Sequence, residues 1–596
     1  MIELIITNRL HQKIFVGKDL PRLISMRPLT KREIAFGRKL GIRRFYLPSL
    51  TKTGSVQFFG EFDRFWDQVV KPFGPDHPFW RNVVSSKMGE WERSTAYFTL
   101  MLFTLAQKVT KESEFIVIVC SSLQEEDLCE EWGEKMGWKV YRIPYLSLPY
   151  WSRRIIQEIM NLRNFLYMSL ICFYKKWFSP KYEPRRLTTK EKNLIVSLFY
   201  ENCFRNGKYR DHFFGNLHNF IMQSGNSVRY LAGPLGDYRK AVKRVRDCDE
   251  ISILIPYSII PWGELIVLIL KIFMRRIRFD RSTFCGMDFS RLIAWNSRRF
   301  EYSFNLDAEI YYSAIRELCE NEQFIRLIQL YEGSVFERAC IQAFRKYSSG
   351  QIVGYSHAVI FPLNLKIRLT DSEKEVRPEP GVLVSTGPEG KRLMAKIGKR
   401  ESTRIYPACS LRYIPVSNTK KADQGARSNI LVALDGVRGS VGVLDWLFEN
   451  AESFKDYSLK LRAHPNMPIK RLLDQCLCDI PDNFSLSDGD LKSDIESSFC
   501  VIYRQSSVGM QALINGVPII HLDIDAALPC DPILNLKASK WAAGTPKGLL
   551  TALQEIRLLD NGLDKASIRT AKKYARNYFR VPDEKNIIGF FVERKA

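Results

Sequence analysis

Three short polar stretches in the last third of the chain each follow an apolar run directly. They are Asp435-Gly436 with Arg438 close behind, Arg462-Ala463-His464-Pro465, and Arg504-Gln505-Ser506-Ser507. The apolar runs have the composition of buried strands, so the polar residues are predicted at strand ends. Hydroxyl groups, the free N–H groups at a helix start, arginine and a histidine N–H all bind phosphate. The spacing therefore favours a phosphate-binding cradle that uses no metal ion.

Each of these residues also has an interpretation without a ligand. Ser506 and Ser507 stand where a helical pattern begins, and serine is among the best helix N-caps. His464 is a single histidine in a rigid turn before a proline, where a hydrogen-bonded structural role is the commoner one. Because the three stretches occur at consecutive predicted strand ends, we favour binding. In that interpretation the serines both cap the helix and face a phosphate.

The segments that must position these residues alternate between strand and helix patterns. Strand patterns occur at 429–434, 457–465, 484–489, 499–503 and 518–522, with helical patterns between them and after them. Such alternation with short loops predicts a parallel sheet covered by helices on both faces, which is a Rossmann-like domain. Open sheets of this kind bind ligands at the carboxyl ends of their strands. All three polar stretches are predicted at that edge.

The alternation also occurs upstream, in a βαβ pattern at 114–145, a strand at 250–256 and further elements over 305–408. Apolar helical insertions near 151–180 and 258–280 make it less regular. The polar stretch from 417 lacks any periodicity and is typical of a linker. We therefore predict an α/β fold with two Rossmann-like domains facing a cleft. The N-terminal domain would span residues 1–416, the linker 417–428 and the C-terminal domain 429–596.

The net charge of +24, from 89 Lys and Arg against 65 Asp and Glu, calls for an anionic partner. No RNP-like, zinc-finger or helix-turn-helix pattern accompanies it, so we expect no nucleic-acid partner. The basic clusters lie beside the apolar segments 161–178 and 258–279, whose apolar runs are too short to span a bilayer. These segments are either interfacial helices on an anionic membrane or buried core helices.

The cysteines and the start of the chain indicate a compartment. Thirteen cysteines are scattered singly apart from Cys476-x-Cys478, and none has zinc-ligand spacing. We expect free thiols in a reducing cytoplasm. The start "MIELIITNRLHQKIFV" has no basic region leading into a long apolar stretch, so a secretory signal is not expected.

Four quoted segments carry a family resemblance. "LKLRAHPNMP" and "VIYRQSSVGMQALINGVPIIHLD" are similar to the HP and SS/ST motifs of GT-B sialyltransferases and Kdo transferases, which hold the CMP part of the donor. "QLYEGSVFERACIQAFRK" and "IVGYSHAVIFP" resemble signatures of bacterial surface-carbohydrate proteins from O-antigen and capsule loci. The resemblance covers residues 327–531. It implies a GT-B glycosyltransferase with an N-terminal acceptor domain and a C-terminal nucleotide-sugar donor domain.

The resemblance also implies roles for individual residues. His464, Ser506 and Ser507 would bind the phosphate and ribose of the donor, and Gly436 would shape the adjacent loop. The acidic-acidic-Gly motif that supplies the catalytic base in the sialyltransferase families has no counterpart here. Either carboxylate or imidazole can act as the base, so Glu332 and His357 at predicted N-domain strand ends are our candidates. The full set of expected donor-binding residues is Gly436, Arg438, Arg462, His464, Pro465, Arg504, Ser506 and Ser507.

These observations predict a cytoplasmic glycosyltransferase that is peripheral to the inner membrane. It would move a sugar, such as a CMP-activated nonulosonic or Kdo-type acid, onto a surface-polysaccharide or lipid-linked acceptor, with no cofactor or metal. Asp523-x-Asp525 has the letters of a metal-binding DxD motif but is predicted in the domain where GT-B enzymes rarely need one. Arg338 is a further candidate for neutralising the donor phosphate. The alternatives are a CDP-glycerol-type polyol-phosphate transferase, a nucleotide-sugar epimerase and a noncatalytic membrane-associated assembly factor.

Overall fold

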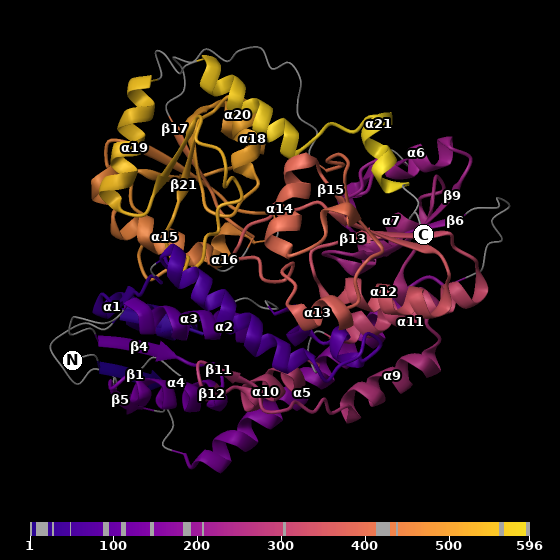
Figure 1. The fold of residues 1–596 in the computed structure, drawn as a ribbon, viewed down its shortest axis with the longest axis horizontal. Coiled ribbons are helices and arrows are strands. Elements are labelled where there is room, and N and C mark those ends of the chain that lie inside the picture. The colour runs from indigo at the N-terminus through magenta and orange to yellow at the C-terminus, as the bar shows by residue number, and fades with distance from the viewer. Residues whose placement is uncertain are drawn as a thin grey trace.

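Three open, parallel sheets organise the chain. The computed structural model describes residues 3–7, 22–26, 29–47, 49–87, 94–108, 115–143, 148–182, 192–205, 208–301, 305–412, 429–436, 439–465, 467–559 and 565–591. The sheets define a first unit (residues 3–143), a middle unit (192–412) and a C-terminal unit (429–559). In Figure 1 the first unit lies at the lower left, the C-terminal unit above it and the middle unit to the right. The linker predicted at 417–428 lies outside the described residues.

The first unit contains a five-stranded sheet in the order β3-β2-β4-β1-β5. The βαβ pattern at 114–145 belongs to this sheet, which the sequence does not predict as a separate layer because β2 and β3 span only four and two residues. Its elements are β1 (Glu3–Thr7), β2 (Arg22–Ser25), α1 (Lys31–Leu40), β3 (Arg43–Arg44), α2 (Lys52–Val70), the 3-10 helices η2 (Pro78–Arg81) and η3 (Val83–Ser86), α3 (Thr95–Lys108), β4 (Phe115–Val119), α4 (Leu123–Lys135) and β5 (Lys139–Arg142).

The middle unit contains a seven-stranded sheet in the order β10-β9-β6-β13-β14-β15-β16. Two small hairpins belong to this part of the chain: β7 (Phe204–Arg205) with β8 (Lys208–Tyr209), and β11 (Thr283–Phe284) with β12 (Met287–Asp288). The second hairpin packs against α2 of the first unit. The other elements of the middle unit are β6 (Lys192–Phe199), η5 (Glu201–Cys203), α6 (Leu217–Gln223), β9 (Ser227–Pro234), α7 (Tyr238–Arg246), β10 (Ser252–Leu254), α8 (Pro256–Ile259), α9 (Trp262–Met274), α10 (Ser290–Glu301), α11 (Asn305–Asn321), β13 (Arg326–Leu330), α12 (Val335–Tyr347), β14 (Gln351–Ser356), α13 (Asp371–Val376), β15 (Val382–Ser385), α14 (Pro388–Gly398), η6 (Ser402–Arg404) and β16 (Ile405–Pro407).

The C-terminal unit contains a six-stranded sheet in the order β19-β18-β17-β20-β21-β22. Its elements are β17 (Asn429–Ala433), α15 (Ser440–Glu449), η8 (Ala451–Phe454), β18 (Ser458–Arg462), α16 (Ile469–Leu473), β19 (Phe484–Leu486), α17 (Leu491–Glu496), β20 (Ser498–Tyr503), α18 (Val508–Ile514), β21 (Ile519–Leu522), β22 (Lys540–Ala543) and α19 (Pro546–Leu559). The five strands predicted here are confirmed, and β22 is an addition.

The strand orders establish the fold class. Numbered along the chain, the C-terminal sheet reads 3-2-1-4-5-6, and the middle sheet follows the same order with a seventh strand added at one edge. This is the order of a Rossmann-like sheet. The predicted α/β fold with two Rossmann-like units is therefore confirmed, and the first unit is a third parallel layer that the sequence did not reveal.

The end of the chain returns from the C-terminal unit to the middle unit. Helix α20 (Lys565–Tyr578) packs against α18 and against α14 of the middle unit. The Arg580 N–H then donates to the Thr386 carbonyl, and the Arg580 carbonyl accepts from the Ser410 N–H. The last elements are α21 (Glu584–Ile587) and η9 (Ile588–Phe590). Phe590 is buried in the core of the middle unit, so the chain end fastens the two Rossmann-like units together.

Both apolar insertions form helices. Helix α5 (Tyr150–Phe178) and helix α9 pack together, with the rings of Phe165 and Phe273 centred 5.3 Å apart. Within the described ranges, neither these nor any other helix combines the length and apolar character needed to cross a bilayer. All thirteen cysteines are free thiols, as the sequence predicts.

Candidate functional site

The two Rossmann-like sheets define where a ligand would bind. In such a sheet the ligand lies outside the carboxyl ends of the strands, at the point where the strand order reverses. This point lies between β6 and β13 in the middle sheet and between β17 and β20 in the C-terminal sheet. The loop after β13 carries Glu332. The loops after β17 and β20 begin at Leu434 and Arg504.

Glu332 and His357 form a pair at the carboxyl edge of the middle sheet, after the neighbouring strands β13 and β14. Their Oε1 and Nε2 atoms lie 3.2 Å apart. The imidazole is buried, whereas 41 % of the Glu332 side chain is exposed. Burial lowers the pKa of His357, and the charge of Arg412 lowers it too, against the opposing effect of Glu332. At neutral pH the pair therefore combines an accessible glutamate with a neutral imidazole that fixes its position.

The Glu337 side chain stabilises the turn that carries Glu332. The backbone N–H groups of Glu332, Gly333 and Ser334 donate to its carboxylate at 2.9 to 3.1 Å. Gly333 has a φ of +78°, and a Cβ atom there would lie 2.6 Å from the carbonyl oxygen of Lys366. Burial, and then the charge of Glu332, raise the pKa of Glu337 to about 7. The turn therefore requires glycine, and one buried carboxyl group accepts from three of its backbone N–H groups.

Arg338 supports the same turn. Its Nη2 donates to the Gly333 carbonyl at 3.0 Å, and its Nη1 donates to the Ser85 hydroxyl at 2.5 Å. Burial lowers the pKa of this guanidinium to about 9. The suggestion that Arg338 neutralises a donor phosphate is wrong, because its side chain is buried and joins the turn to the first unit.

Three histidines and Arg412 gather where the middle and C-terminal units meet. His212 lies in the loop after β6, next to Phe213, whose ring is centred 4.8 Å from that of His357. The Arg412 guanidinium lies 5.5 Å from the centre of the Phe213 ring. Burial lowers the pKa of His212 to about 4, with further lowering by Arg412, His357 and His464. The structure thus brings His357 of the middle unit and His464 of the C-terminal unit near enough to His212 for both to act on it electrostatically.

His464 also contacts the loop after β17. A Cβ atom on Gly436 would lie 2.8 Å from its Nδ1, so the backbone of Gly436 lies directly against the imidazole. Asp435 joins this loop to the loop after β20, because its Oδ1 accepts from the Gln505 N–H at 3.1 Å. Burial raises the pKa of Asp435, against the opposing charge of Arg504. Two of the predicted polar stretches are therefore bonded together, and His464 from the third lies against them.

The predicted capping role is confirmed for Ser506 alone, because Ser507 stands at the N-cap position of α18 but forms no side-chain capping hydrogen bond. The Ser506 hydroxyl accepts from the Val508 N–H at 3.3 Å, and Ser507 immediately precedes α18. A hydroxyl oxygen that accepts a hydrogen bond can still donate its own proton. A donor contact from this pair stays a prediction.

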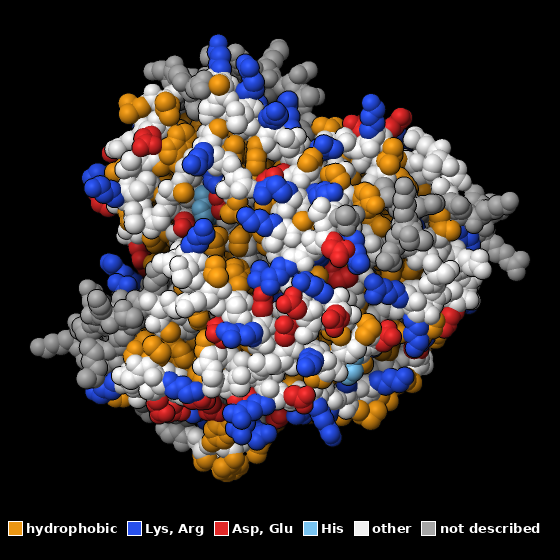
Figure 2. Space-filling model, viewed as in Figure 1, with side chains coloured by type: hydrophobic (Ala, Val, Ile, Leu, Met, Phe, Trp, Pro, Cys, Tyr) orange, Lys and Arg blue, Asp and Glu red, His pale blue; other side chains and the backbone are white. Residues whose placement is uncertain are grey.

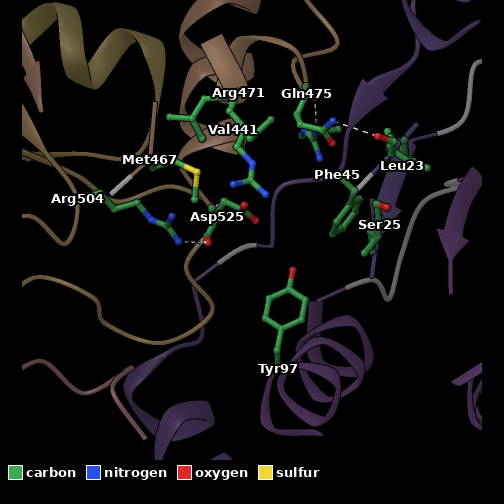
Figure 3. A pocket seen from close by; sticks show the side chains of 16 residues that line it. Leu23, Ser25, Phe45, Tyr97, Val441, Met467, Arg471, Gln475, Arg504 and Asp525 are labelled. Carbon is green, nitrogen blue, oxygen red and sulfur yellow. Dashed lines mark hydrogen bonds between the residues drawn. The ribbon is translucent and has the colours of Figure 1, made fainter. Parts of the chain in front are cut away.

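Arg504 lines a cavity of about 230 Å³ between the C-terminal unit and the first unit. Its Nη2 donates to the Asp525 carbonyl at 2.7 Å, and the Oδ1 of Asp525 accepts from the Leu47 N–H at 3.0 Å. Figure 3 shows Arg471 and Arg504 entering from one side and the Tyr97 hydroxyl from the other. The lining residues are Leu23, Ile24, Ser25, Leu29, Arg44, Phe45, Tyr97, Gly439, Val441, Gly442, Met467, Arg471, Leu472, Gln475, Arg504 and Asp525.

This cavity was not predicted from the sequence. Its floor is Asp525 after β21, and its walls include the beginning of α15 and the end of β2. Arginine side chains around a partly enclosed volume suit an anionic ligand. No sequence signal could have revealed it, because seven of its sixteen lining residues come from the first unit, far upstream of Arg471 in the sequence.

The remaining predicted residues lie differently. Arg462 donates from Nη1 to Asp494, Ser487 and the Gly489 carbonyl within the C-terminal unit, so its guanidinium is already engaged. Pro465 is an exposed turn residue. Arg438 lies outside the described residues.

The two aspartates of the DxD-like sequence help to pack the C-terminal unit against the first unit. Asp523 accepts from the Ser49 hydroxyl at 3.2 Å, and Asp525 accepts from Leu47, so both carboxylates contact the first unit. In the part of the chain that the structure describes, no group of three or more His, Cys, Asp or Glu side chains is arranged to hold a metal.

Comparison with known proteins gives matches among solved structures. No family model and no curated protein matches the sequence. One similar structure is a glycotransferase of kitacinnamycin, with 13 % identity, 66 % of this chain and 95 % of that one covered, and a TM-score of 0.37. MurG of Acinetobacter baumannii has 14 % identity, coverages of 65 % and 96 % and a TM-score of 0.35. UDP-GlcNAc 2-epimerase of Neisseria meningitidis bound to UDP-GlcNAc has 12 % identity, with 67 % of this chain and 97 % of that one covered, and a TM-score of 0.36. The fold class given above rests on the strand orders of the two sheets.

Proposed function

We propose that the protein is a GT-B glycosyltransferase that moves a sugar from a nucleotide donor to a surface-glycan or lipid-linked acceptor. One observation carries this proposal. His357 of the Glu332–His357 pair, at the carboxyl edge of one Rossmann-like sheet, and His464, at the carboxyl edge of the other, both lie close enough to His212 to lower its pKa. A general base and a phosphate-binding edge on two such sheets are the parts that a sugar transfer needs.

Glu332 is the proposed general base. It would take the proton from the acceptor hydroxyl as that oxygen bonds to the anomeric carbon of the donor. The bond from that carbon to the donor phosphate oxygen breaks at the same time, and the nucleotide leaves with the electron pair. His357 is a positioning residue, because its buried Nε2 lies 3.2 Å from the carboxylate and leaves Glu332 exposed toward an acceptor.

The C-terminal edge is the proposed donor site. His464, the Gly436 backbone and the Ser506-Ser507 turn would face the donor phosphate, in the order that the sialyl- and Kdo-transferase resemblance implies. Arg504 would add charge from the cavity beside Asp525. A donor of the CMP-acid type carries a carboxylate on its sugar. The guanidinium of Arg412, or that of another arginine at this edge, would form an ion pair with this carboxylate.

We also propose a peripheral place on the cytoplasmic face of the inner membrane. Helices α5 and α9 expose many large apolar side chains, including Trp177 and Leu170. Vesicle co-sedimentation tests this placement with Leu170→Glu, whose side chain is 65 % exposed, and with Leu558→Glu on α19 as a matched control. Leu170→Glu should release the protein from vesicles and Leu558→Glu should not. Equal binding by both variants and the wild type would contradict the placement.

The donor is tested by thermal shift with CMP, UDP, GDP and CDP on the wild type and on His464→Ala. We expect selective stabilisation by CMP that the substitution removes. Product analysis with the corresponding sugar nucleotide then follows. Preference for UDP or GDP would retain the transferase and reject the CMP-acid donor. Transfer of glycerol phosphate from CDP-glycerol would support the polyol-phosphate alternative, and interconversion of the free sugar nucleotide would support an epimerase. Stabilisation by none of them would support a noncatalytic assembly factor.

A further inference from the structure

Helices α5 and α9 form a broad apolar face. They run antiparallel, since Phe165 of α5 contacts Phe273 near the end of α9, while Phe173 and Trp177 of α5 face Trp262 at its start. Hydrophobic side chains gather at the lower edge of the molecule in Figure 2, in the region where Figure 1 places these helices. The exposed ones are Tyr150, Trp151, Ile155, Ile156, Ile159, Met160, Leu162, Leu166, Tyr167, Leu170, Tyr174, Trp177, Trp262, Ile266, Val267, Leu270, Phe273 and Met274.

A cavity of about 830 Å³ lies behind the first half of α5 and at the end of α9, within the size range of small-molecule sites. Met274 on the apolar face precedes Arg275 and Arg276 in the cavity wall, so face and cavity adjoin. The lining residues are Gln124, Asp127, Leu128, Glu131, Tyr150, Arg154, Glu158, Arg275, Arg276, Ile277, Asp288, Arg291, Leu292, Ala294, Trp295, Ser297 and Arg298.

The four carboxylates of this cavity already have partners. Glu158 pairs with Arg298 at 3.0 Å and Glu131 pairs with Lys135 at 2.9 Å. Asp127 pairs with Arg142 at 2.9 Å. Asp288 accepts from the Ser290 hydroxyl and N–H at 2.6 and 2.9 Å. The negative charge of the wall is therefore largely satisfied within the protein.

Most polar groups of the cavity without a partner among the described residues are donors, and the one acceptor among them is the buried Oε1 of Gln124. Arg154 and Arg291 are exposed and form no hydrogen bond or ion pair with any described residue, although the charge of Arg291 helps to lower the pKa of Asp288. The indole N–H of Trp295 is buried with no acceptor in the described part of the chain. A buried N–H without a partner costs free energy unless a ligand accepts from it. Two exposed guanidinium groups and an indole N–H suit a ligand with several anionic oxygens.

We propose that this cavity binds the phosphate headgroup of an anionic phospholipid while the apolar face of α5 and α9 lies in the membrane. The proposal rests on the membrane placement given above. An interfacial helix lies at the boundary between headgroups and acyl chains, so a cavity directly behind such a helix is at headgroup depth. Arg154 and Arg291 would pair with the phosphate oxygens, and the Trp295 N–H would donate to one of them.

The test uses the full-length protein and two lipid probes. Calorimetry with dihexanoyl-phosphatidylglycerol below its micelle concentration measures headgroup binding, and vesicles of phosphatidylcholine with and without phosphatidylglycerol measure docking. Arg154→Gln and Arg291→Gln should each weaken short-lipid binding about fivefold, and Trp295→Phe should weaken it to a smaller extent. Arg163→Gln, an exposed arginine on α5 outside the cavity, and Arg569→Gln on α20 are the matched controls and should leave it unchanged. Thermal unfolding should be unaltered in all of these surface arginine variants.

The outcomes separate headgroup binding from docking. Leu170→Glu should lose vesicle binding but still bind the short lipid, and the Arg154→Gln/Arg291→Gln double variant should lose the preference for anionic over neutral vesicles. The proposal is overturned if the short lipid does not bind the wild type, if Arg163→Gln weakens it as much as Arg154→Gln, or if inorganic phosphate binds equally well while the double variant keeps its vesicle preference. None of these measurements involves a sugar nucleotide. Their outcome therefore does not depend on whether the proposed transferase activity is correct.

Discussion

At the scale of single residues, Glu332 and His357 differ in exposure, and this difference supports the roles that we propose for them. The glutamate reaches solvent, whereas the imidazole is buried and its pKa is lowered mainly by burial. A neutral, buried histidine can orient a carboxylate without competing for its proton at neutral pH. The exposed carboxylate is thus the group that an acceptor hydroxyl can approach.

Glu332→Gln should therefore greatly slow sugar transfer but leave binding of the donor nucleotide unchanged. We expect a fall in kcat of about 10² to 10⁴, the usual contribution of a general base, with an unchanged thermal shift from the donor nucleotide. Single-turnover transfer assays together with nucleotide titrations measure the two effects. Glu375→Gln, an exposed glutamate on α13, is the matched control. Retention of kcat in Glu332→Gln would exclude this residue as the base.

Gly436→Ala tests the donor edge by a steric change. A Cβ atom at this position would lie 2.8 Å from His464 Nδ1, so the imidazole or the loop must move. We expect about a tenfold loss of nucleotide affinity, measured by calorimetry. Gly60→Ala on α2, where a Cβ atom meets nothing within 4 Å, should change nothing. Equal affinities for Gly436→Ala and the wild type would show that the donor does not depend on this contact.

The residues that the sequence pointed to were those beside recognisable strand ends. Glu332, His357, Gly436 and His464 each follow a strand that the pattern predicted, and the structure places them at the expected sheet edges. His212 was missed because the strand before it was missed. Arg412 was missed because it approaches the histidines only through folding, and nothing near it in the sequence marks a site.

At the scale of elements, the regular alternation of strand and helix patterns made the C-terminal unit predictable. Where this alternation is interrupted, as after β6, the elements were missed. The run "KNLIVSLF" forms β6, a central strand of the middle sheet, but η5 and the hairpin of β7 and β8 follow it instead of a helix. This irregular loop carries His212. Strand β22 was missed for a different reason, since "KWAA" is too short to show periodicity.

The turn that presents Glu332 should make stability depend on pH through Glu337. The folded-state pKa of about 7 lies above the ordinary value of 4.5, so the unfolded chain releases this proton first. Ionisation thus favours unfolding, and the contribution of this group to stability falls as the pH rises from about 4.5 to 7. In Glu337→Gln that fall should disappear. Urea denaturation of both proteins at pH 5 and pH 7.5 measures it, and an identical pH dependence in the two would contradict the assignment.

At the scale of the whole molecule, the first unit is joined to both Rossmann-like units. Toward the middle unit it contributes the buried pairs Arg81–Glu309, at 2.8 Å, and Lys87–Glu373, at 2.5 Å. Toward the C-terminal unit it contributes Arg44, whose Nε donates to the buried carboxylate of Asp445. Arg44 is also part of the wall of the Arg504 cavity. The sequence could not reveal these contacts, because every pair joins segments more than 200 residues apart.

Two arginines of the first unit allow a matched test of the interface between the first unit and the C-terminal unit. Arg44 pairs with Asp445, whose side chain is fully buried, whereas Arg38 pairs with Asp479, whose side chain is 86 % exposed. Removing one partner of a buried pair leaves an uncompensated charge and costs about 3–5 kcal/mol, while an exposed pair is worth about 0–1 kcal/mol. The Leu477 and Cys478 N–H groups still donate to Asp445 and moderate the loss.

Arg44→Ala should therefore lower the free energy of unfolding by several times the effect of Arg38→Ala, measured by urea denaturation. Because Arg44 also lines the Arg504 cavity, its loss should weaken anion binding there, which titration with inorganic phosphate reports. If both variants cost the same, the first unit is held to the C-terminal unit by its apolar contacts and not by this buried charge. In that case the cavity would owe its shape to the backbone bonds at Leu47 and Leu50, which reach the loop after β21 independently of either arginine.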